Sequence, residues 1–376
     1  MTLIATLPAE IGSPVEEVDT PSLLIDLAAF ERNLARLASV VRGTPVNLRP
    51  HAKTHKSPVI ALRQIALGAV GVCCQKVSEA EVMVYGGVGD VLVSNQIVGG
   101  SKIRRLLSLA KQARISVCVD NAANVSALND AALVAKVRLP VLTEINVGND
   151  RCGVEPGEPA VTLARQVAGA PGLEFAGIQA YYGRAQHIRE FEKRREAAHR
   201  GAEKVSQTLD LLRRDGLACR VVTGGGTGSY QFDIEAGVLT ELQAGSYIFM
   251  DADYGRNLGE RRDSVTDFEH SLFVYATVMS RPTSGRAVVD AGLKSVSVDS
   301  GMPVVHGMSD IEYDRASDEH GRLTLHDPGR ELHLGDKIWL VPGHCDPTVN
   351  LFDWYVGIRE RRVECLWPVA ARGAVS

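Results

Sequence analysis

The sequence predicts an α/β enzyme, with a (β/α)8 barrel of the TIM type followed by a C-terminal all-β domain. Eight apolar strand-like runs alternate with helix-period segments over about 200 residues, which suits a closed barrel better than an open sheet. After about residue 262 the helical segments stop, and short strand-like runs separated by Gly, Pro and Asp turns follow. We expect a barrel domain over residues 22–260 and a β domain over residues 261–376. The N-terminal strand region, residues 1–21, is expected to be part of the β domain.

The first elements are a short apolar strand within Asp19–Asp26 and a helix-period segment over Leu27–Val41. The eight strands expected for the barrel are Val46–Leu48, Gly71–Cys74, Asp90–Val93, Ile115–Val119, Pro140–Val147, Leu173–Ala180, Cys219–Val222 and Glu241–Tyr247. Helix-period segments between them include Lys102–Lys111, Gly157–Val167 and Phe191–Leu212, whereas the last link, Gly224–Thr240, is short for a full helix.

Strand-like runs also make up the C-terminal part of the chain. We expect strands at Ser271–Met279, Ala287–Asp290, Ser295–Asp299, Arg322–Leu325 and Lys337–Val341. Val356–Ile358 and Val363–Leu366 flank a charged turn and predict a hairpin. The C-terminal part is therefore expected to be a separate all-β module.

Composition narrows the class of protein. The chain has 376 residues, 45% of them hydrophobic and 23% charged, as expected for a soluble protein with a large core. A net charge of −4 argues against nucleic-acid binding, and no apolar run is long enough to predict a membrane helix.

The cysteines and the first residues of the sequence bear on location. The start, Met1 to Pro8, has neither the basic region nor the apolar run of a signal peptide. The seven cysteines include the adjacent pair Cys73 and Cys74 and show no zinc-type spacing. We therefore expect reduced thiols and a cytoplasmic protein.

The stretch Arg49-Pro-His-Ala-Lys-Thr-His-Lys56 follows the first barrel strand. Positive neighbours disfavour a protonated amine, so one of its two lysines could have a lowered pKa and act as a nucleophile. The alternative is a solvated basic loop or an anion-binding patch.

Two glycine-containing loops follow the seventh and eighth strands. Gly224-Gly-Gly-Thr-Gly-Ser229 and Gln243-Ala-Gly-Ser-Tyr247 offer backbone N–H groups and hydroxyls, and barrels often bind phosphate at this corner. A phosphate anchor and a crowded lysine at the end of strand one together predict pyridoxal phosphate, held by its aldehyde and its phosphate.

His344 and Asp346 flank Cys345. On an extended segment, residues i and i+2 project to the same side, so the imidazole and the carboxylate could bind one cation while Cys345 points away. Mixed N/O donors suit Mn²⁺ or Mg²⁺ better than a thiolate-rich zinc site. The alternative is a surface turn before Pro347.

Specific motifs occur along nearly the whole chain. They are Arg49–Lys56, Gly71-Val-Cys-Cys-Gln-Lys-Val-Ser-Glu-Ala-Glu81, the two glycine loops, Ser317-Asp-Glu-His-Gly321 and Pro342-Gly-His-Cys-Asp-Pro-Thr348. By these motifs the chain resembles the alanine-racemase-like fold (fold type III) of pyridoxal-phosphate enzymes. Within that fold it resembles the metal-activated D-threonine aldolase and 3-hydroxy-D-aspartate aldolase group, with D-serine dehydratase as a relative.

The resemblance implies a role for several residues of the cofactor site. Lys53, not Lys56, would be the Schiff-base lysine, and Arg151 would interact with the ring side of the cofactor. Gln75 and Tyr181 would also contact the cofactor, and the phosphate would be held by Thr227, Gly228, Gly245 and Ser246. Taken without the resemblance, Arg151 reads as a helix-entry cation and Gln75 and Tyr181 as polar core residues.

The resemblance also implies that His344 and Asp346 hold an activating divalent metal. Because the dehydratases tend to have His-x-Cys, Asp346 favours the aldolases over the dehydratases. His187 matches a histidine that, in the resembling aldolases, acts as a base on the substrate hydroxyl. The alternative interpretation is that His187 is an ordinary histidine at the N-terminus of a helix. Tyr182 departs from the histidine or glutamine expected beside Tyr181, which leaves substrate specificity open there.

The predicted reaction is a retro-aldol cleavage of a D-configured β-hydroxy-α-amino acid to glycine and an aldehyde, catalysed by a homodimer. One alternative is a dehydratase acting on D-serine or D-threo-3-hydroxyaspartate, and a distant one is a non-catalytic pyridoxal-phosphate protein. The substrate side chain beyond Cβ, the metal, and the roles of His51, His55 and His320 stay open at this point.

Overall fold

The computed structural model describes residues 7–265, 267–327 and 329–376, and its larger unit is a ring of eight parallel strands. The sheet order is β2-β9-β8-β7-β6-β5-β4-β3, and a parallel bridge between His51 and Cys73 joins its two ends. The strands are β2 (Asn47–Leu48), β3 (Val72–Cys74), β4 (Asp90–Gln96), β5 (Arg114–Val119), β6 (Leu139–Glu144), β7 (Leu173–Ala180), β8 (Val221–Gly224) and β9 (Glu241–Leu242). The predicted (β/α)8 barrel is confirmed, with shorter first and last strands.

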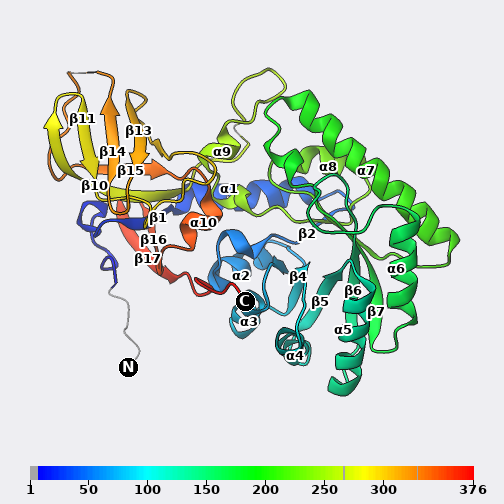
Figure 1. Ribbon diagram of the computed structural model, residues 1–376. Coiled ribbons are helices and arrows are strands. Elements are labelled where there is room, and N and C mark those ends of the chain that lie inside the picture. Colours follow the sequence, from blue (N-terminus) through cyan, green and yellow to red (C-terminus); the bar gives the residue numbers. More distant parts are fainter. Residues whose placement is uncertain (1–6, 266, 328) are drawn as a thin grey trace.

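Helices cover the outside of this ring (Figure 1). They are α1 (Leu27–Val41), α2 (Pro58–Ala66), α3 (Val77–Tyr85), α4 (Gly100–Leu109), α5 (Ala122–Ala135), α6 (Glu158–Gly169), α7 (Phe191–Arg214) and α8 (Tyr230–Ala236). The last of these has only seven residues, as the short final link predicts.

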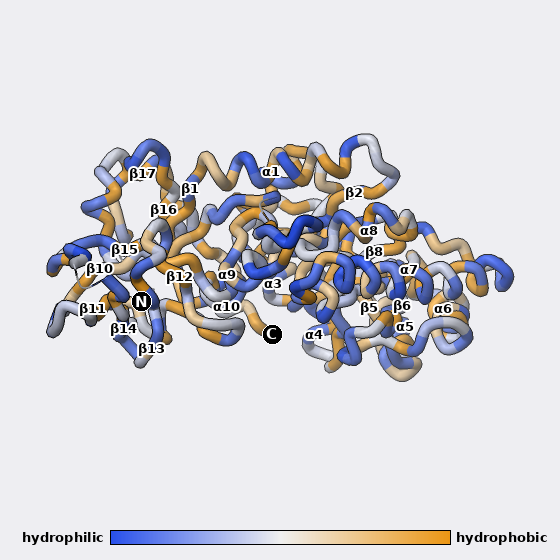
Figure 2. The backbone as a smooth tube through the Cα atoms, turned by 90° about the horizontal axis from the view of Figure 1, so that it is seen from above, coloured by the Kyte–Doolittle hydropathy of each residue, from blue (hydrophilic) through white to orange (hydrophobic). Residues whose placement is uncertain are grey.

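Helix α1 shows how the local sequence produces the packing. Asp26 caps it by accepting hydrogen bonds from the amides of Ala28 and Ala29. Phe30, Leu34 and other apolar residues at helical spacing are buried, and Figure 2 shows hydrophobic and hydrophilic turns alternating along the helix. Burial of this face fixes the helix against both units.

Small and branched side chains fill the inside of the barrel. Cys73, Leu92, Cys118 and Leu142 form one buried cluster there, as expected for a packed core and not a pore. All seven cysteines are free thiols.

The second unit is a nine-stranded sheet. β1 (Ser22–Asp26) lies inside the range predicted for the barrel, but it pairs antiparallel with β10 and parallel with β16 in this sheet. The other strands are β10 (Leu272–Thr283), β11 (Arg286–Val289), β12 (Val304–Val305), β13 (Ile311–Ala316), β14 (Gly321–Leu325), β15 (Lys337–Val341), β16 (Trp354–Arg359) and β17 (Arg362–Pro368). The exact division of the chain at 260 and 261 stays a prediction, and residues 1–6 of the predicted N-terminal region lie outside the described residues.

The C-terminal predictions are partly wrong. The hairpin of β16 and β17 is confirmed, but Ser295–Asp299 is not a strand. The amides of Ser295 and Val296 both donate to Gly292 O, which makes a turn there. The short strand β12, the strand β13 and the helix α10 (Cys345–Val349) were not predicted.

The two units meet at the loop that carries the basic octapeptide. Tyr355 Oη of β16 donates to His55 O (2.7 Å), and Ala371 N donates to Lys56 O (2.9 Å). Segments 300 or more residues apart in sequence therefore fix this loop. None of the helices described here combines the length and apolar character needed to span a membrane.

Candidate active site

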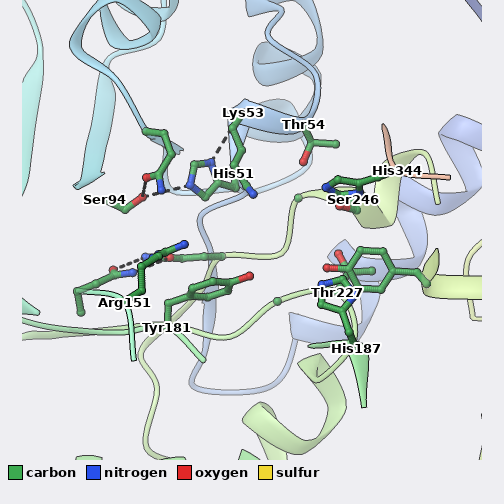
Figure 3. Close-up of a pocket in the computed structure, with 16 residues that line it drawn as sticks. His51, Lys53, Thr54, Ser94, Arg151, Tyr181, His187, Thr227, Ser246 and His344 are labelled. Carbon is green, nitrogen blue, oxygen red and sulfur yellow. Dashed lines mark hydrogen bonds between the residues drawn. The ribbon is translucent and has the colours of Figure 1, made fainter. Parts of the chain in front are cut away.

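A polar pocket lies where the loops after the barrel strands meet α10 and the segment after β9 (Figure 3). It brings together residues predicted from widely separated parts of the sequence. Those that line it are Lys53, Gln75, Arg151, Tyr181, His187, Thr227, Gly245, Ser246 and His344. Asp346 joins them through its contact with Lys53.

Lys53 lies in a short 3-10 turn, Ala52–Thr54, immediately after β2. Its side chain is 39% exposed, and its Nζ is 3.0 Å from Asp346 Oδ2. Asp346 raises the pKa of Lys53 above its ordinary value, and this outweighs the opposing effects of burial and Arg151. The predicted lowering of the lysine pKa is therefore wrong. The prediction considered only the positive residues next to Lys53 in the sequence, whereas the fold places the carboxylate of Asp346, from the other unit, beside it.

Most of the other charge in the octapeptide has a structural partner. Arg49 is buried, donates to both carboxylate oxygens of Glu241 on β9, and pairs with Asp90 on β4 at 2.7 Å. Lys56 Nζ lies 3.0 Å from Glu79 Oε1, and both side chains are almost fully buried. The octapeptide is thus neither a solvated loop nor an open anion patch.

The two histidines of the octapeptide, indistinguishable from sequence, differ in position. His51 lines the pocket, whereas His55 is fully buried and its Nδ1 accepts from Ser57 N (3.1 Å). Burial, and then the positive charge of Lys53, lower the pKa of His51 well below its ordinary value.

A chain of hydrogen bonds runs from His51 to Gln75. His51 Nδ1 accepts from Lys53 N (3.3 Å), so a neutral ring carries its proton on Nε2. That nitrogen lies 3.2 Å from Ser94 Oγ, which in turn lies 3.2 Å from Gln75 Oε1. This chain orients the amide of Gln75 at the wall of the pocket.

The octapeptide and the two glycine loops provide small polar groups at the pocket. Thr227 Oγ1 and Thr54 Oγ1 are buried and have no hydrogen-bond partner among the described residues. A Cβ atom on Gly245 would lie 2.6 Å from Thr54 Oγ1, so only glycine fits there. These hydroxyls suit an acceptor-rich group such as a phosphate.

Gly228 is the one predicted phosphate residue that the structure does not bring into the pocket. Its N–H donates to Gln186 Oε1 (2.9 Å), and the residue lines a neighbouring cavity. Gly226, which was not predicted, lines the pocket in the same loop.

Arg151 and Tyr181 form a pair on the pocket wall. The guanidinium carbon of Arg151 lies 5.6 Å from the centre of the Tyr181 ring, a cation–π contact. Tyr182, where specificity was left open, does not line this pocket; it packs near Gly148 and Gly201. His320 lies in the turn between β13 and β14 and lines a separate surface cavity.

His344 and Asp346 meet, though not on an extended segment as expected. His344 is the N-cap of α10 and Asp346 lies in its first turn, with His344 Nε2 4.0 Å from Asp346 Oδ2. Neither oxygen of Asp346 accepts a hydrogen bond of regular geometry within the described residues. Cys345 does point away, its Sγ donating to Met250 O (3.2 Å).

Asp251 holds His344 from the opposite side. Its buried carboxylate lies 2.8 Å from His344 Nδ1 and also accepts from Cys345 N (3.1 Å). Because the Asp251 carboxylate can only accept a hydrogen bond, a neutral His344 carries its proton on Nδ1. Its Nε2, which faces Asp346, then has a free lone pair that can bind a metal. Sequence reasoning missed Asp251, although its place just after the eighth strand is where barrel enzymes keep functional groups.

His187 ends the 3-10 helix Arg184–His187 that follows β7. Its Nδ1 lies 2.5 Å from Asp253 Oδ2, and its ring packs against that of Tyr254 with centroids 5.1 Å apart. Asp253 and Tyr254 were also missed.

The barrel, the lysine after its first strand and the glycine loops define an alanine-racemase-like protein. The family described as "Alanine racemase, N-terminal domain" matches residues 25–253, and "Putative serine dehydratase domain" matches residues 271–358. The chain is 48% identical to a D-threonine aldolase of Arthrobacter sp (97% of this chain, 96% of the relative). It is 46% identical to a 3-hydroxy-D-aspartate aldolase of Paracoccus denitrificans strain Pd 1222 (98% and 95%).

A solved structure of D-threonine aldolase from Filomicrobium marinum superposes with a TM-score of 0.96 at 51% identity, covering 99% of this chain and all of the other. The chain belongs to the family of D-threonine aldolases and 3-hydroxy-D-aspartate aldolases, and it is a carbon–carbon lyase. The resemblance stated from the sequence motifs is confirmed.

Proposed function

We propose that this enzyme cleaves a D-configured β-hydroxy-α-amino acid, of the D-threonine or 3-hydroxy-D-aspartate type, to glycine and an aldehyde. We further propose that it uses pyridoxal phosphate and a divalent cation, Mn²⁺ or Mg²⁺. The observation that carries the proposal is the meeting of Lys53 with Asp346, 3.0 Å apart, in a pocket that also holds His187. The similarity to aldolases named for these two substrates supports it.

The residues present fit pyridoxal phosphate. Lys53 would hold its aldehyde carbon covalently, and Arg151, Gln75 and Tyr181 would line its ring. The phosphate would lie beside the Thr227 hydroxyl, with Ser246 and Gly245 also at that end. When bound, this cofactor takes up the electron pair released at the substrate Cα.

The residues at α10 fit a hard divalent cation. His344 Nε2 and the carboxylate oxygens of Asp346, one of which lies 3.0 Å from Lys53 Nζ, are N and O ligand atoms on one side of the pocket. The described residues contain no group of three or more His, Cys, Asp or Glu that could hold a metal, so water and substrate would complete the coordination. A cation there would compete with the Lys53 ammonium for Asp346, which removes the main cause of the raised lysine pKa.

The chain's own groups divide the remaining work. His187 accepts the proton of the substrate β-hydroxyl, so that the oxygen can form the carbonyl of the aldehyde as the Cα–Cβ bond breaks. Arg151 and the pocket hydroxyls would hold the cofactor in the pocket, so that the substrate is oriented before the bond breaks.

A substrate panel tests the proposal. With pyridoxal phosphate and Mn²⁺ or Mg²⁺, D-threonine or a 3-hydroxy-D-aspartate should release glycine, and the corresponding L-amino acids should not. Chelation with EDTA should remove most activity, and adding back each metal in turn identifies the preferred one. Ammonia and a keto acid without glycine would contradict the proposal and favour a dehydratase.

We also propose a cytoplasmic homodimer that acts on a small molecule and binds neither nucleic acid nor membranes. The net charge of −4 supports the absence of nucleic-acid binding, and the free thiols support a cytoplasmic location. The dimer is proposed from the family resemblance alone. Light scattering of the purified holoenzyme should give about twice the 40.5 kDa chain mass; a monomeric mass would contradict the dimer.

A further inference from the structure

His187 can act as a base only if the nitrogen that faces the pocket is unprotonated. A neutral imidazole carries its proton on either Nδ1 or Nε2, and the partner of one nitrogen decides the state of the other. The structure places Asp253 Oδ2 2.5 Å from His187 Nδ1. An ionised carboxylate only accepts, so this contact puts the proton on Nδ1 and leaves Nε2 as the acceptor.

Asp253 is itself held so that it stays ionised. It lies in α9 (Ala252–Gly255), its side chain is 7% exposed, and its Oδ1 accepts from both Arg189 (2.5 Å) and Arg256 (2.7 Å). Burial alone would raise the pKa of Asp253, but Arg189 and His187 lower it below the ordinary value. One carboxylate oxygen is thus occupied by two guanidinium groups, and the other is directed at the histidine.

The histidine ring is fixed in its plane as well. Tyr254, the residue after Asp253, packs against it, and Asp253 N donates to Gly343 O (3.1 Å), which ties the segment to the residue before His344. Arg189 Nη1 adds hydrogen bonds to Asp253 O and Asn257 Oδ1. These contacts therefore fix the geometry of the His187–Asp253 pair.

We infer that Asp253 is the positioning residue that sets the tautomer of His187 and stabilises the imidazolium formed during cleavage. This inference deepens the proposed function and rests on it. In the step, the substrate O–H bond breaks and an N–H bond forms at His187 Nε2. The oxygen electron pair becomes the second bond of the aldehyde carbonyl, and the Cα–Cβ pair stays with Cα, which later takes one proton to give glycine. Asp253 keeps its charge throughout, because both arginines stay on Oδ1.

The substitution Asp253→Asn tests the inference sharply. Arg189 and Arg256 accept no hydrogen bonds, so the amide oxygen must face them and the NH₂ group must face His187 Nδ1. That contact forces the proton onto Nε2 and removes the base. We expect kcat for glycine release to fall by about 10²–10⁴-fold with KM little changed.

Three comparisons separate positioning from a structural role. D-alanine, which lacks the β-hydroxyl, should shift the visible cofactor band of Asp253→Asn at the same concentration as in the parent enzyme. The double variant Asp253→Asn/His187→Gln should be no slower than His187→Gln alone, because both changes remove one function. Asp267→Asn is a matched control, because Asp267 accepts a hydrogen bond from Tyr230 away from this pocket. This variant should leave kcat unchanged.

A measurement on the parent holoenzyme does not depend on any variant at Asp253. With histidine labelled in ¹⁵N and Mg²⁺ as the metal, the signals lost in His187→Gln identify His187, and they should show a protonated Nδ1. A protonated Nε2 in a neutral ring, a loss of kcat under tenfold in Asp253→Asn, or losses that multiply in the double variant would each overturn the inference. If the parent enzyme releases no glycine, the proposed function fails instead.

Discussion

Lys53 and Lys56 lie three residues apart in one basic octapeptide, yet the fold gives them different environments. Lys53 reaches the pocket, is 39% exposed and faces Asp346 of the C-terminal unit. Lys56 adopts a left-handed backbone (φ 50°), is 10% exposed and pairs with Glu79 of the barrel. Each lysine has one carboxylate partner at 3.0 Å, so the partner's place in the fold, and not the number of charges nearby, separates the two roles.

The two carboxylates explain the difference. Glu79 is 1% exposed and also accepts from Gln75 N (2.7 Å), so its pair with Lys56 is a fixed part of the core. Asp346 contacts Lys53 and His344, but neither of its oxygens accepts a well-aligned hydrogen bond among the described residues. The Lys53 pair can therefore be opened by a ligand, whereas the Lys56 pair can be opened only by unfolding.

Replacement of Lys53 should have the largest effect. Lys53→Ala removes the only lysine that lines the pocket among the described residues, so the visible cofactor band should disappear. Glycine release should fall by on the order of 10⁴-fold or more. Absorbance spectra and steady-state assays of both lysine variants check this, with Lys56→Met expected to keep the band. A band retained in Lys53→Ala would reverse the assignment of the two lysines.

Replacement of Lys56 should act on stability. Lys56→Met leaves Glu79 as a buried charge without its cation, which costs about 3–5 kcal/mol of unfolding free energy. The double variant Lys56→Met/Glu79→Gln should recover most of this loss, since no uncompensated charge remains. Urea unfolding of the two variants measures both values. A Lys56→Met protein as stable as the parent would show that the pair is not fixed in the core.

Asp346→Asn should weaken metal binding and lower glycine release by about 10²-fold, because a cation supplies several kcal/mol of charge stabilisation. Glu79→Gln, the matched change at the partner of the other lysine, should leave metal binding intact. Electron paramagnetic resonance titration with Mn²⁺ compares the affinities directly. Equal Mn²⁺ affinity in parent and Asp346→Asn protein would exclude Asp346 as a ligand.

Replacement of His55, which lies between the two lysines, should have the smallest effect. The expected change is in how the stability of the protein depends on pH. Burial lowers its pKa from 6.5 to about 3. Above pH 6.5 the histidine is neutral in both states, and between pH 6.5 and pH 3 only the unfolded chain takes up its proton, so this contribution to stability is lost as the pH falls. His55→Asn, whose side-chain oxygen can still accept from Ser57 N, should remove about 2 kcal/mol of the stability difference between pH 7 and pH 5. Identical pH dependence in parent and variant would show that His55 is not kept neutral.

Much of the fold was predictable, because the barrel strands are apolar runs that recur with a regular period. The lysine, the glycine loops and the His-x-Asp pair were predictable as motifs, and the family resemblance distinguished Lys53 from Lys56. Asp251 and Asp253 were not, since an aspartate near a helix start reads as an ordinary cap until the histidines it faces are in place. The raised pKa of Lys53 was also hidden, because Asp346 is 293 residues away in the chain and only the packing of the two units brings it near.

Reduction of the holoenzyme with borohydride tests the central claim most directly, because it fixes pyridoxal phosphate to whichever lysine holds it. Proteolysis and mass spectrometry of the reduced protein then locate the modified residue. The structure predicts the modification on Lys53, with Lys56 unmodified in its pair with Glu79. Modification of Lys56, or of neither lysine in a protein that binds the cofactor, would contradict this account.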